Sequence, residues 1–244
     1  MNPHLEISSL YCSYGETEIL SNVDLSLKKG EIGCLLGASG SGKTTLLRAI
    51  AGFENINTGF VALDGNQLSN SNKTLAPEKR KIGMIFQDFA LFPHLSVKQN
   101  IEFGIHDLDR DIRLKLSEKM ISLVGLSGLE NAMPYQLSGG QQQRVAIARA
   151  LAAKPDLLLC DEITSALDVS VQASMMQLLT ELKSKRQLTV LFVSHDLPVV
   201  GALADHVAIL RNGRICEAGA TQEVFEQPAH PYTRELLAAV LSHR

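Results

Sequence analysis

An eight-residue stretch near the N-terminal end of the chain has the composition and spacing of a phosphate-binding loop. Residues 37–44 are Gly-Ala-Ser-Gly-Ser-Gly-Lys-Thr, which fits the pattern GxxxxGK followed by Ser or Thr. Glycines there let the backbone turn so tightly that successive N–H groups point inward at a β-phosphate. Lys43 can reach the β- and γ-phosphate oxygens, and the Thr44 hydroxyl can bind Mg²⁺.

The alternative interpretation is a glycine-rich turn with a chance lysine. The loop lies between an apolar run and a helical one, however, and this context favours a nucleotide site. The predicted nucleotide contacts in this region are Gly37, Ala38, Ser39, Gly40, Ser41, Gly42, Lys43, Thr44 and Thr45.

Two acidic residues, Asp161 and Glu162, stand directly after the apolar run Leu157–Cys160. Burying an unpaired charge is costly, so two carboxylates at the end of a buried strand indicate a functional site rather than packing. His195 has a similar place, after the apolar run 188–193. A single histidine is more often structural, so His195 alone carries less weight than the acidic pair.

Ser138, Gly139 and Gly140 open a predicted helix over about 141–154. The first N–H groups of a helix lack partners within it and carry partial positive charge, so this is a second candidate anion site. The chain thus has two candidate anion sites and one candidate catalytic base.

The phosphate loop alone leaves GTPases, kinases and many ATPases open. The pentapeptide Leu137–Gln141, Leu-Ser-Gly-Gly-Gln, closely resembles the signature of ABC ATPases, and the resemblance extends from about Leu5 to Leu241. In that family the signature of one copy closes over the ATP that the phosphate loop of the other copy holds, so twofold symmetry produces two shared sites. The resemblance implies ATP and Mg²⁺ as cofactors and a second copy of the chain, or a paralogue, as partner.

The resemblance also implies a role for each matching residue. Glu162 corresponds to the base that orients the attacking water, His195 to a γ-phosphate contact, and Tyr14 to the aromatic residue that stacks on adenine. The implied catalytic residues are Lys43, Gln87, Glu162 and His195, and the implied metal ligands are Thr44, Gln87 and Asp161. The remaining implied ATP contacts are Ser138, Gly139, Gly140, Gln141 and Asp168, the last in the loop Ser165–Asp168 that communicates across the dimer.

Two positions depart from the family pattern. Ala38 replaces the proline usual in the phosphate loop, which we expect to cost rigidity but no phosphate contact. Ile163 replaces the proline usual after the catalytic glutamate, which frees a backbone N–H and relaxes φ. No catalytic side chain is missing, so we expect hydrolysis; a clamp that binds ATP without hydrolysing it would lack Glu162 or His195.

Strand-like and helix-like runs alternate along the chain, which predicts a mostly parallel sheet covered on both faces. The class expected is an α/β P-loop NTPase, to which the resemblance adds an N-terminal antiparallel β subdomain. One domain, 1–244, would comprise a core of about 1–88 and 154–244 and an inserted helical subdomain of about 89–153. The predicted strands are 31–36, 60–63, 81–87, 157–160 and 188–193; the predicted helices, besides the one over 141–154, are 44–51 and 171–185.

Three further local predictions concern the connecting segments. Residues 67–80 are polar and contain Pro77, so we expect a loop. Ile112, Leu116, Met120 and Leu123 recur at helical spacing before Gly125 and predict the apolar face of a helix. Residues 207–218 are expected to form a hairpin with a type I′ turn at Asn212-Gly213.

The composition excludes several classes of protein. A net charge of -3 and a pI near 6.2 give no overall attraction to nucleic acid. The four cysteines lack metal-ligand spacing and fit a reduced compartment. The N-terminus does not have the layout of a signal peptide, and no apolar run approaches the ~20 residues that span a bilayer. A membrane role would therefore require a membrane-spanning partner.

The apolar run Phe89–Val97 follows Gln87, where the family receives a coupling helix of the membrane-spanning permease; core packing is the alternative. Residues 86–95 are similar to importers of ferric iron, polyamines and sulfate, and residues 32–36 and 48–54 favour the iron branch. The resemblance implies permease subunits and a solute-binding protein as partners, no nucleic acid, and a place at the cytoplasmic face of the inner membrane.

The run His230–Leu237 also resembles importer subunits. Members of the iron and polyamine branch often continue into a C-terminal β-rich regulatory domain, for which we expect no room here, and this weakens the assignment to that branch. The rival interpretation is an ABC-family ATPase that acts outside transport. Such proteins usually have tandem halves, long coiled coils or basic surfaces, and this chain shows one half, no long heptad segment and a negative net charge.

Overall fold

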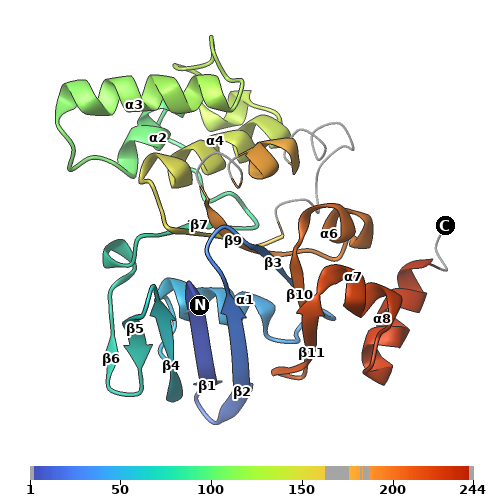
Figure 1. The fold of residues 1–244 in the computed structure, drawn as a ribbon. Helices are drawn as coiled ribbons and strands as arrows, with labels where there is room; N and C mark the ends of the chain where they lie inside the picture. The colour runs from blue at the N-terminus through green and yellow to red at the C-terminus, as the bar shows by residue number, and fades with distance from the viewer. Residues whose placement is uncertain (1–2, 163–175, 182, 184–186, 242–244) are drawn as a thin grey trace.

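The structure, a computed structural model, describes residues 3–162, 176–181, 183 and 187–241. Its central sheet has the strand order β11-β10-β3-β9-β8-β7, and every neighbouring pair is parallel except β10 and β11 (Figure 1). Strands β3, β8 and β9 are buried along their whole length, as expected for continuous apolar runs covered on both faces. The bounds are β3 Ile32–Leu36, β7 Ile82–Ile85, β8 Leu157–Cys160, β9 Thr189–Val193, β10 His206–Arg211 and β11 Arg214–Ala220.

A second, antiparallel sheet has the strand order β2-β1-β4-β5-β6. It confirms the expected N-terminal antiparallel part of the fold. Its strands are β1 Leu5–Tyr14, β2 Thr17–Leu27, β4 Thr58–Leu63, β5 Asn66–Asn70 and β6 Lys73–Thr74.

The predicted loop over 67–80 is wrong, because most of β5, all of β6 and a 3₁₀ turn, η1 (Pro77–Lys79), lie within it. Strand β6 forms the edge of the sheet and β5 lies next to it, and Leu68 is the one buried apolar side chain in these two strands. The polar composition that predicts a loop is equally typical of such a short edge strand.

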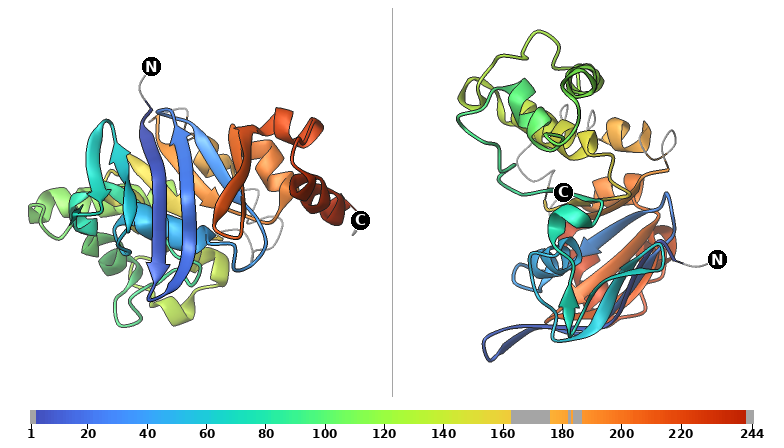
Figure 2. Two further views of the ribbon diagram at one scale, coloured as in Figure 1. Left: turned by 90° about the horizontal axis from the view of Figure 1, so that it is seen from below. Right: turned by 90° about the vertical axis from the view of Figure 1, so that its left-hand side faces the viewer.

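Helix α1 (Lys43–Ala51) lies between the two sheets. Its residues Leu46, Leu47 and Ile50 belong to one apolar cluster with Leu5 of the antiparallel sheet and Leu159 of the parallel sheet. The left-hand view of Figure 2 shows this helix behind β1 and β2. The helix ends at Gly52, whose φ is 90°, as the sequence predicted.

A helical block covers the other face of the parallel sheet and follows β7 in the chain. The right-hand view of Figure 2 shows it at one end of the molecule. It contributes to a cluster that includes Val145 of α4 and Cys160 of β8. Its elements are α2 Val97–Phe103, α3 Arg110–Leu123, η2 Pro134–Gln136 and α4 Gly139–Ala152.

The expected apolar face of α3 is only partly correct. Met120 is buried and Leu116 is partly buried, but Ile112 is 56% exposed and Leu123 is exposed. The buried side of the helix instead includes Ser117 and Ile121, so the predicted face is rotated relative to the real one. Ser117 is buried because its hydroxyl donates hydrogen bonds to Glu102 and to the Leu114 carbonyl.

The C-terminal part contains α6 (Leu197–Leu203), α7 (Thr221–Glu226) and α8 (Pro231–Leu241). The hairpin of β10 and β11 is confirmed, and Asn212 and Gly213 have the positive φ values of a type I′ turn, 48° and 75°. Of the helix predicted over 171–185, residues 176–181 are helical and most of the rest lie outside the described residues. None of the described helices is long and apolar enough to cross a membrane.

Candidate nucleotide site

The phosphate loop connects β3 to α1 and fits closely against two other strands. A Cβ on Gly37 would lie 2.1 Å from the carbonyl oxygen of Leu210 in β10. A Cβ on Gly42 would lie 2.8 Å from Leu20 in β2, and Gly42 also has a φ of 107°. Glycine is therefore required at position 37 by the close approach of the Leu210 backbone and at position 42 by the positive φ, in addition to any approach of a phosphate.

Lys43 extends back over the loop. Its Nζ donates hydrogen bonds to the carbonyl oxygens of Gly37 at 2.9 Å and Ala38 at 2.8 Å. Burial lowers the pKa of Lys43, and the negative charges of Glu162 and Asp161 oppose that shift. The hydroxyl of Ser41 in the same loop is buried and has no hydrogen-bond partner among the described residues. An ammonium and an unpaired hydroxyl on one loop suit an anionic ligand.

The two acidic residues come from the end of β8, as predicted. Asp161 is 4% exposed, and the Thr44 hydroxyl donates to its Oδ1 at 3.3 Å. Burial raises the pKa of Asp161, and the hydrogen bond from Thr44 opposes this effect. The neighbouring Glu162 has a positive φ of 51°, which is uncommon for a non-glycine residue. Its Oε2 accepts a hydrogen bond of 3.1 Å from Nε2 of Gln87.

These side chains fit a Mg²⁺ ion. Mg²⁺ prefers oxygen ligands and is usually held by one or two protein groups together with waters and substrate phosphates. The Thr44 hydroxyl and the Asp161 carboxylate are in contact, and Gln87 reaches the same region through Glu162. Within the described ranges, no group of three or more His, Cys, Asp or Glu residues could hold a metal ion.

Lys43, Glu162 and His195 line one cavity of about 430 Å³. His195 is exposed and follows β9, and the next residues are held by a local cap in which the Asp196 N–H donates to the Ser194 hydroxyl at 3.1 Å. The other lining residues are Leu36, Gly37, Ala38, Ser39, Ser194, Leu197, Leu236 and Ala239. The structure therefore brings together three of the predicted catalytic residues.

Two lining residues, Leu236 and Ala239, lie on α8 and were not predicted for the site. The run His230–Leu237 was the available signal, but it was interpreted only as a family resemblance. Its position shows that the C-terminal helix forms part of the wall around the phosphate loop.

The predicted signature residues form the start of α4. The Gln141 N–H donates to the Ser138 hydroxyl at 3.3 Å and the Ser138 N–H donates to Gln141 Oε1 at 2.9 Å, which is a capping box. Gly139 and Gly140 form the first turn of the helix, and a Cβ on Gly139 would meet nothing. Among the described residues that line the 430 Å³ cavity, none belongs to Ser138–Gln141. One chain therefore does not place this second anion site at its own phosphate loop.

Tyr14, the predicted adenine contact, ends β1 and is 46% exposed. Burial is the largest cause of a raised Tyr14 pKa, a hydrogen bond with Glu54 adds to it, and one with Thr45 opposes it. Tyr14 and Thr45 are therefore neighbours at the start of α1. Asp168 and the rest of Ser165–Asp168, together with Ile163, lie outside the described residues.

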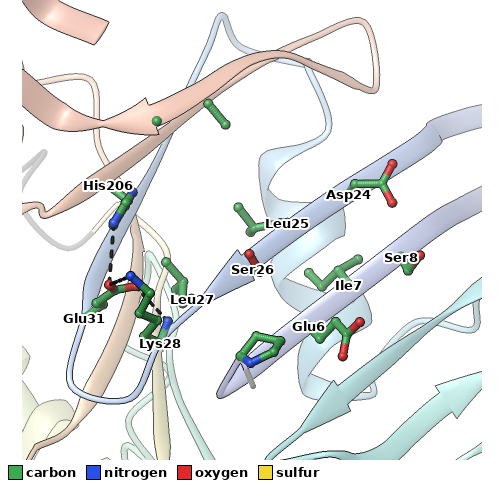
Figure 3. A pocket seen from close by; sticks show the side chains of 13 residues that line it. Glu6, Ile7, Ser8, Asp24, Leu25, Ser26, Leu27, Lys28, Glu31 and His206 are labelled. Carbon is green, nitrogen blue, oxygen red and sulfur yellow. Dashed lines mark hydrogen bonds and ion pairs between the residues drawn. The ribbon is translucent and has the colours of Figure 1, made fainter. Parts of the chain in front are cut away.

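A second pocket lies where the two sheets meet (Figure 3) and has a volume of about 600 Å³. Glu31 is one of its charged lining residues, with Oε1 3.6 Å from Lys28 Nζ and 3.6 Å from His206 Nε2. Glu6 and Asp24 also line it. It contains none of the predicted site residues.

The family comparison decides which class of nucleotide protein this is. A family model described as "ABC transporter" matches residues 20–165, which include the phosphate loop, Gln87, the signature and both acidic residues. The chain belongs to the ABC transporter family. Its fold is accordingly that of the ATP-binding cassette, a P-loop NTPase fold.

Curated relatives of this ABC family member cover nearly all of the chain. The Fe(3+) ions import ATP-binding protein FbpC of Fusobacterium nucleatum subsp. nucleatum is 39% identical over 94% of this chain and 62% of its own length. The methionine import ATP-binding protein MetN of Rhizobium johnstonii is 42% identical over 93% of this chain and 64% of its own length. The chain thus spans less than two thirds of the length of these relatives.

Solved structures of ATP-binding cassettes are similar over the same range. One, described as dimeric in a post-hydrolysis state bound to ADP and Pi, has a TM-score of 0.80 and 33% identity and covers 89% of this chain and 98% of its own. Another, cbiO1 from Clostridium perfringens, described as part of the ABC transporter complex cbiONQ, has a TM-score of 0.84 and 29% identity. It covers 100% of this chain and 98% of its own.

Proposed function

We propose that this chain is the ATP-binding and ATP-hydrolysing subunit of an ABC importer. One observation carries the proposal: the phosphate-loop lysine, Lys43, shares a cavity with an acidic residue, Glu162, and a histidine, His195, beside the Thr44–Asp161 pair. Phosphoryl transfer to water depends on positioning and charge neutralisation, which this set of groups supplies.

In this proposal Lys43 and the loop amides hold the β- and γ-phosphates. Thr44, Gln87 and Asp161 would hold Mg²⁺, which supplies neutralisation of the phosphate charge when it is bound. Glu162 accepts a proton from the attacking water, and its hydrogen bond from Gln87 fixes the direction of the carboxylate. His195 contacts the γ-phosphate, and Tyr14 stacks on the adenine.

We propose further that residues about 89–153 act as an inserted subdomain that presents the signature to a second copy or a paralogue, while about 1–88 and 154–244 form the ATP-binding core. Ser138–Gln141 would then meet the ATP on the partner's phosphate loop, with Asp168 near the same interface. The separation of the signature from the cavity of its own chain supports this arrangement. So does the dimeric state given for one of the similar cassettes.

The surface next to Gln87 suits a permease. The rings of Phe92 and Phe103 are in contact at a tilt of 44°, with centroids 4.2 Å apart, and Phe103 is 50% exposed. Arg149 fixes the segment before them by donating to the carbonyl oxygens of Phe89 and Ala90 at 2.9 and 2.6 Å. We propose that a membrane-spanning permease docks here, together with a solute-binding protein elsewhere in the system. The chain would thus work at the cytoplasmic face of the inner membrane.

The assignment of a class of solute has weaker support. Residues 32–36 and 48–54 favour ferric iron, and one relative is named for Fe(3+) import. Others are named for methionine import. We therefore propose import of a small solute, with ferric iron as the first solute to test.

The experiment is gel filtration and phosphate release on the Glu162→Gln protein. We expect its kcat to fall by about 10²–10⁴, the usual contribution of general-base catalysis, while ATP binding survives. Trapped ATP should shift this variant from monomer to dimer only when Mg²⁺-ATP is present. Adding Ser138→Arg should abolish the shift, and adding Ser127→Arg, a matched change at an exposed site of the same helical block, should not.

Near-normal turnover of Glu162→Gln would show that Glu162 is not the base. A dimer that survives Ser138→Arg would show that the signature face is not the interface. Copurification of a membrane-spanning protein with the wild-type chain tests the importer assignment separately.

A further inference from the structure

Helix α8 is fixed to the parallel sheet at its N-terminal end. Glu217 on β11 accepts hydrogen bonds from the backbone N–H groups of Ala229 at 2.8 Å and His230 at 3.0 Å. His230 in turn accepts a hydrogen bond of 3.1 Å from the Tyr232 N–H through its Nδ1. The first turn of α8, beside β11 and α7 in Figure 1, therefore has a defined position relative to the sheet.

Tyr232 is the residue of this turn that reaches the nucleotide site. Its hydroxyl oxygen accepts a hydrogen bond of 3.0 Å from the backbone N–H of Ala38. The Arg211 guanidinium carbon lies 4.6 Å from the centre of the Tyr232 ring, so the ring is also in a cation–π contact. The hydroxyl group is held in place by both of these contacts and by the anchored helix turn.

Ala38 is the residue of the phosphate loop that Tyr232 contacts. Its carbonyl oxygen accepts hydrogen bonds from Lys43 Nζ at 2.8 Å and from the Ser41 N–H at 3.2 Å. The same lysine binds the carbonyl oxygen of Gly37. The Gly37–Ala38 peptide therefore carries both the N–H that binds Tyr232 and one of the two carbonyl oxygens that direct Lys43. Because the Ala38 N–H points at Tyr232, it serves to hold the loop and not to contact a phosphate.

We propose that Tyr232 is a positioning residue of the nucleotide site, which holds the first part of the phosphate loop through the Ala38 amide. The contact depends on the residue type at position 38, because proline has no N–H to donate. Alanine stands here in place of the usual proline, and the hydrogen bond to Tyr232 replaces the rigidity that a proline ring gives. A loop that is already ordered loses less entropy when ATP binds, so the bond increases ATP affinity.

This inference rests on the ATP binding proposed above, and a double-mutant cycle tests it. The four proteins are wild type, Tyr232→Phe, Ala38→Pro and the double variant, each titrated with Mg²⁺-ATP and assayed for KM and kcat. We expect Tyr232→Phe to weaken ATP binding and raise KM by about two- to tenfold, the loss of one hydrogen bond, with kcat within about twofold. In the Ala38→Pro background the same change should have no effect, since the amide donor is already gone.

Tyr11→Phe is the matched control, because it removes a tyrosine hydroxyl from the partly buried strand β1 and should leave the ATP affinity unchanged. Hydrogen exchange of the Ala38 amide gives a second readout that does not depend on the proline variant. Exchange should be faster in Tyr232→Phe than in wild type.

Equal weakening by Tyr232→Phe in both backgrounds would overturn the proposal, because the effect would then come from the ring. Unchanged affinity and unchanged Ala38 exchange in the single variant would overturn it as well. A wild-type chain that fails to bind ATP would instead refute the proposed function, so the two failures are distinguishable.

Discussion

The side-chain amide of Gln87 donates a hydrogen bond to the carboxylate of Glu162, with 3.1 Å between Nε2 and Oε2. Gln87 follows β7 and leads toward the helical block, whereas Glu162 follows the neighbouring strand β8. The bond therefore joins the proposed base to the segment that begins the proposed permease surface. A displacement of that segment would change the direction of the carboxylate.

Gln87→Ala should accordingly lower kcat by about 10-fold or more, because a hydrogen bond to a charged group is lost and the carboxylate is no longer directed. The effect on KM for Mg²⁺-ATP should be smaller than the effect on kcat: Gln87 is also a proposed Mg²⁺ ligand, but Thr44 and Asp161 remain to hold the ion. The measurement is steady-state phosphate release. Gln222→Ala is the control, because it removes the same kind of bond, Gln222 Nε2 to Glu226 Oε1 at 3.0 Å, on the distant helix α7. A normal kcat for Gln87→Ala would contradict the proposed positioning of Glu162.

The elements that hold this site were predictable where burial dictates the sequence. Strands β3, β8 and β9 are apolar at almost every position because both faces are covered, and the phosphate loop and acidic pair follow directly from two of them. The short, mostly polar strands β5 and β6 gave no such signal. The prediction of which face of α3 is buried was partly wrong, because Ile112 is exposed whereas a hydrogen-bonded serine, Ser117, is buried.

Sequence patterns did not predict the contacts between segments that are distant in the chain. Tyr232 and Ala38 are 194 residues apart, and neither residue type indicates the other. The same holds for Arg80, which lies at the end of the predicted loop 67–80. Such pairs depend on the whole chain path, whereas a pattern reports only the immediate surroundings of a residue.

Arg80 is 1% exposed and connects the C-terminal end of α1 to the antiparallel sheet. Its guanidinium donates to the carbonyl oxygens of Leu75 at 2.7 Å and Ile50 at 2.8 Å and to the Ser69 hydroxyl at 2.6 Å. Burial lowers its pKa to about 10. A Cβ on Gly52 would lie 2.3 Å from Arg80 Nε. The glycine that ends α1 therefore also leaves room for the Arg80 side chain.

Arg80→Met should therefore lower the free energy of unfolding by roughly 3–5 kcal/mol, because the buried carbonyl groups at the end of α1 lose their donor. Urea unfolding followed by circular dichroism measures this. Arg48→Met is the matched control, because Arg48 lies on α1 itself and is largely exposed, with its Nη1 3.9 Å from Glu54 Oε1. This variant should change the free energy of unfolding by no more than about 1 kcal/mol. Equal effects of the two variants would show that Arg80 does not stabilise the joint between α1 and the antiparallel sheet.

Glu217 makes the attachment of α8 dependent on pH. Burial acts to raise its pKa, but the neighbouring Thr233 side chain and the hydrogen bonds from the backbone N–H groups of Ala229 and His230 outweigh this, so the pKa is lowered from its ordinary 4.5. A carboxylate with a lowered folded-state pKa stabilises the folded state above its unfolded-state pKa and loses that effect as the pH falls through the folded-state value. We therefore expect Glu217→Gln to lower the melting temperature at pH 7. The difference from wild type should shrink as the pH falls below 4.5, the ordinary value.

Glu235→Gln is the control for this last variant, because it removes the same charge from an exposed position on α8. Its melting temperature should follow that of wild type at every pH.

Glu217→Gln should also raise KM for ATP in the same direction as Tyr232→Phe, since a loosened first turn of α8 no longer holds the Tyr232 hydroxyl at Ala38. Thermal melts between pH 3 and pH 8 and nucleotide titrations at pH 7 together measure both effects. A pH-independent difference in melting temperature would show that the charge of Glu217 is not what anchors the helix.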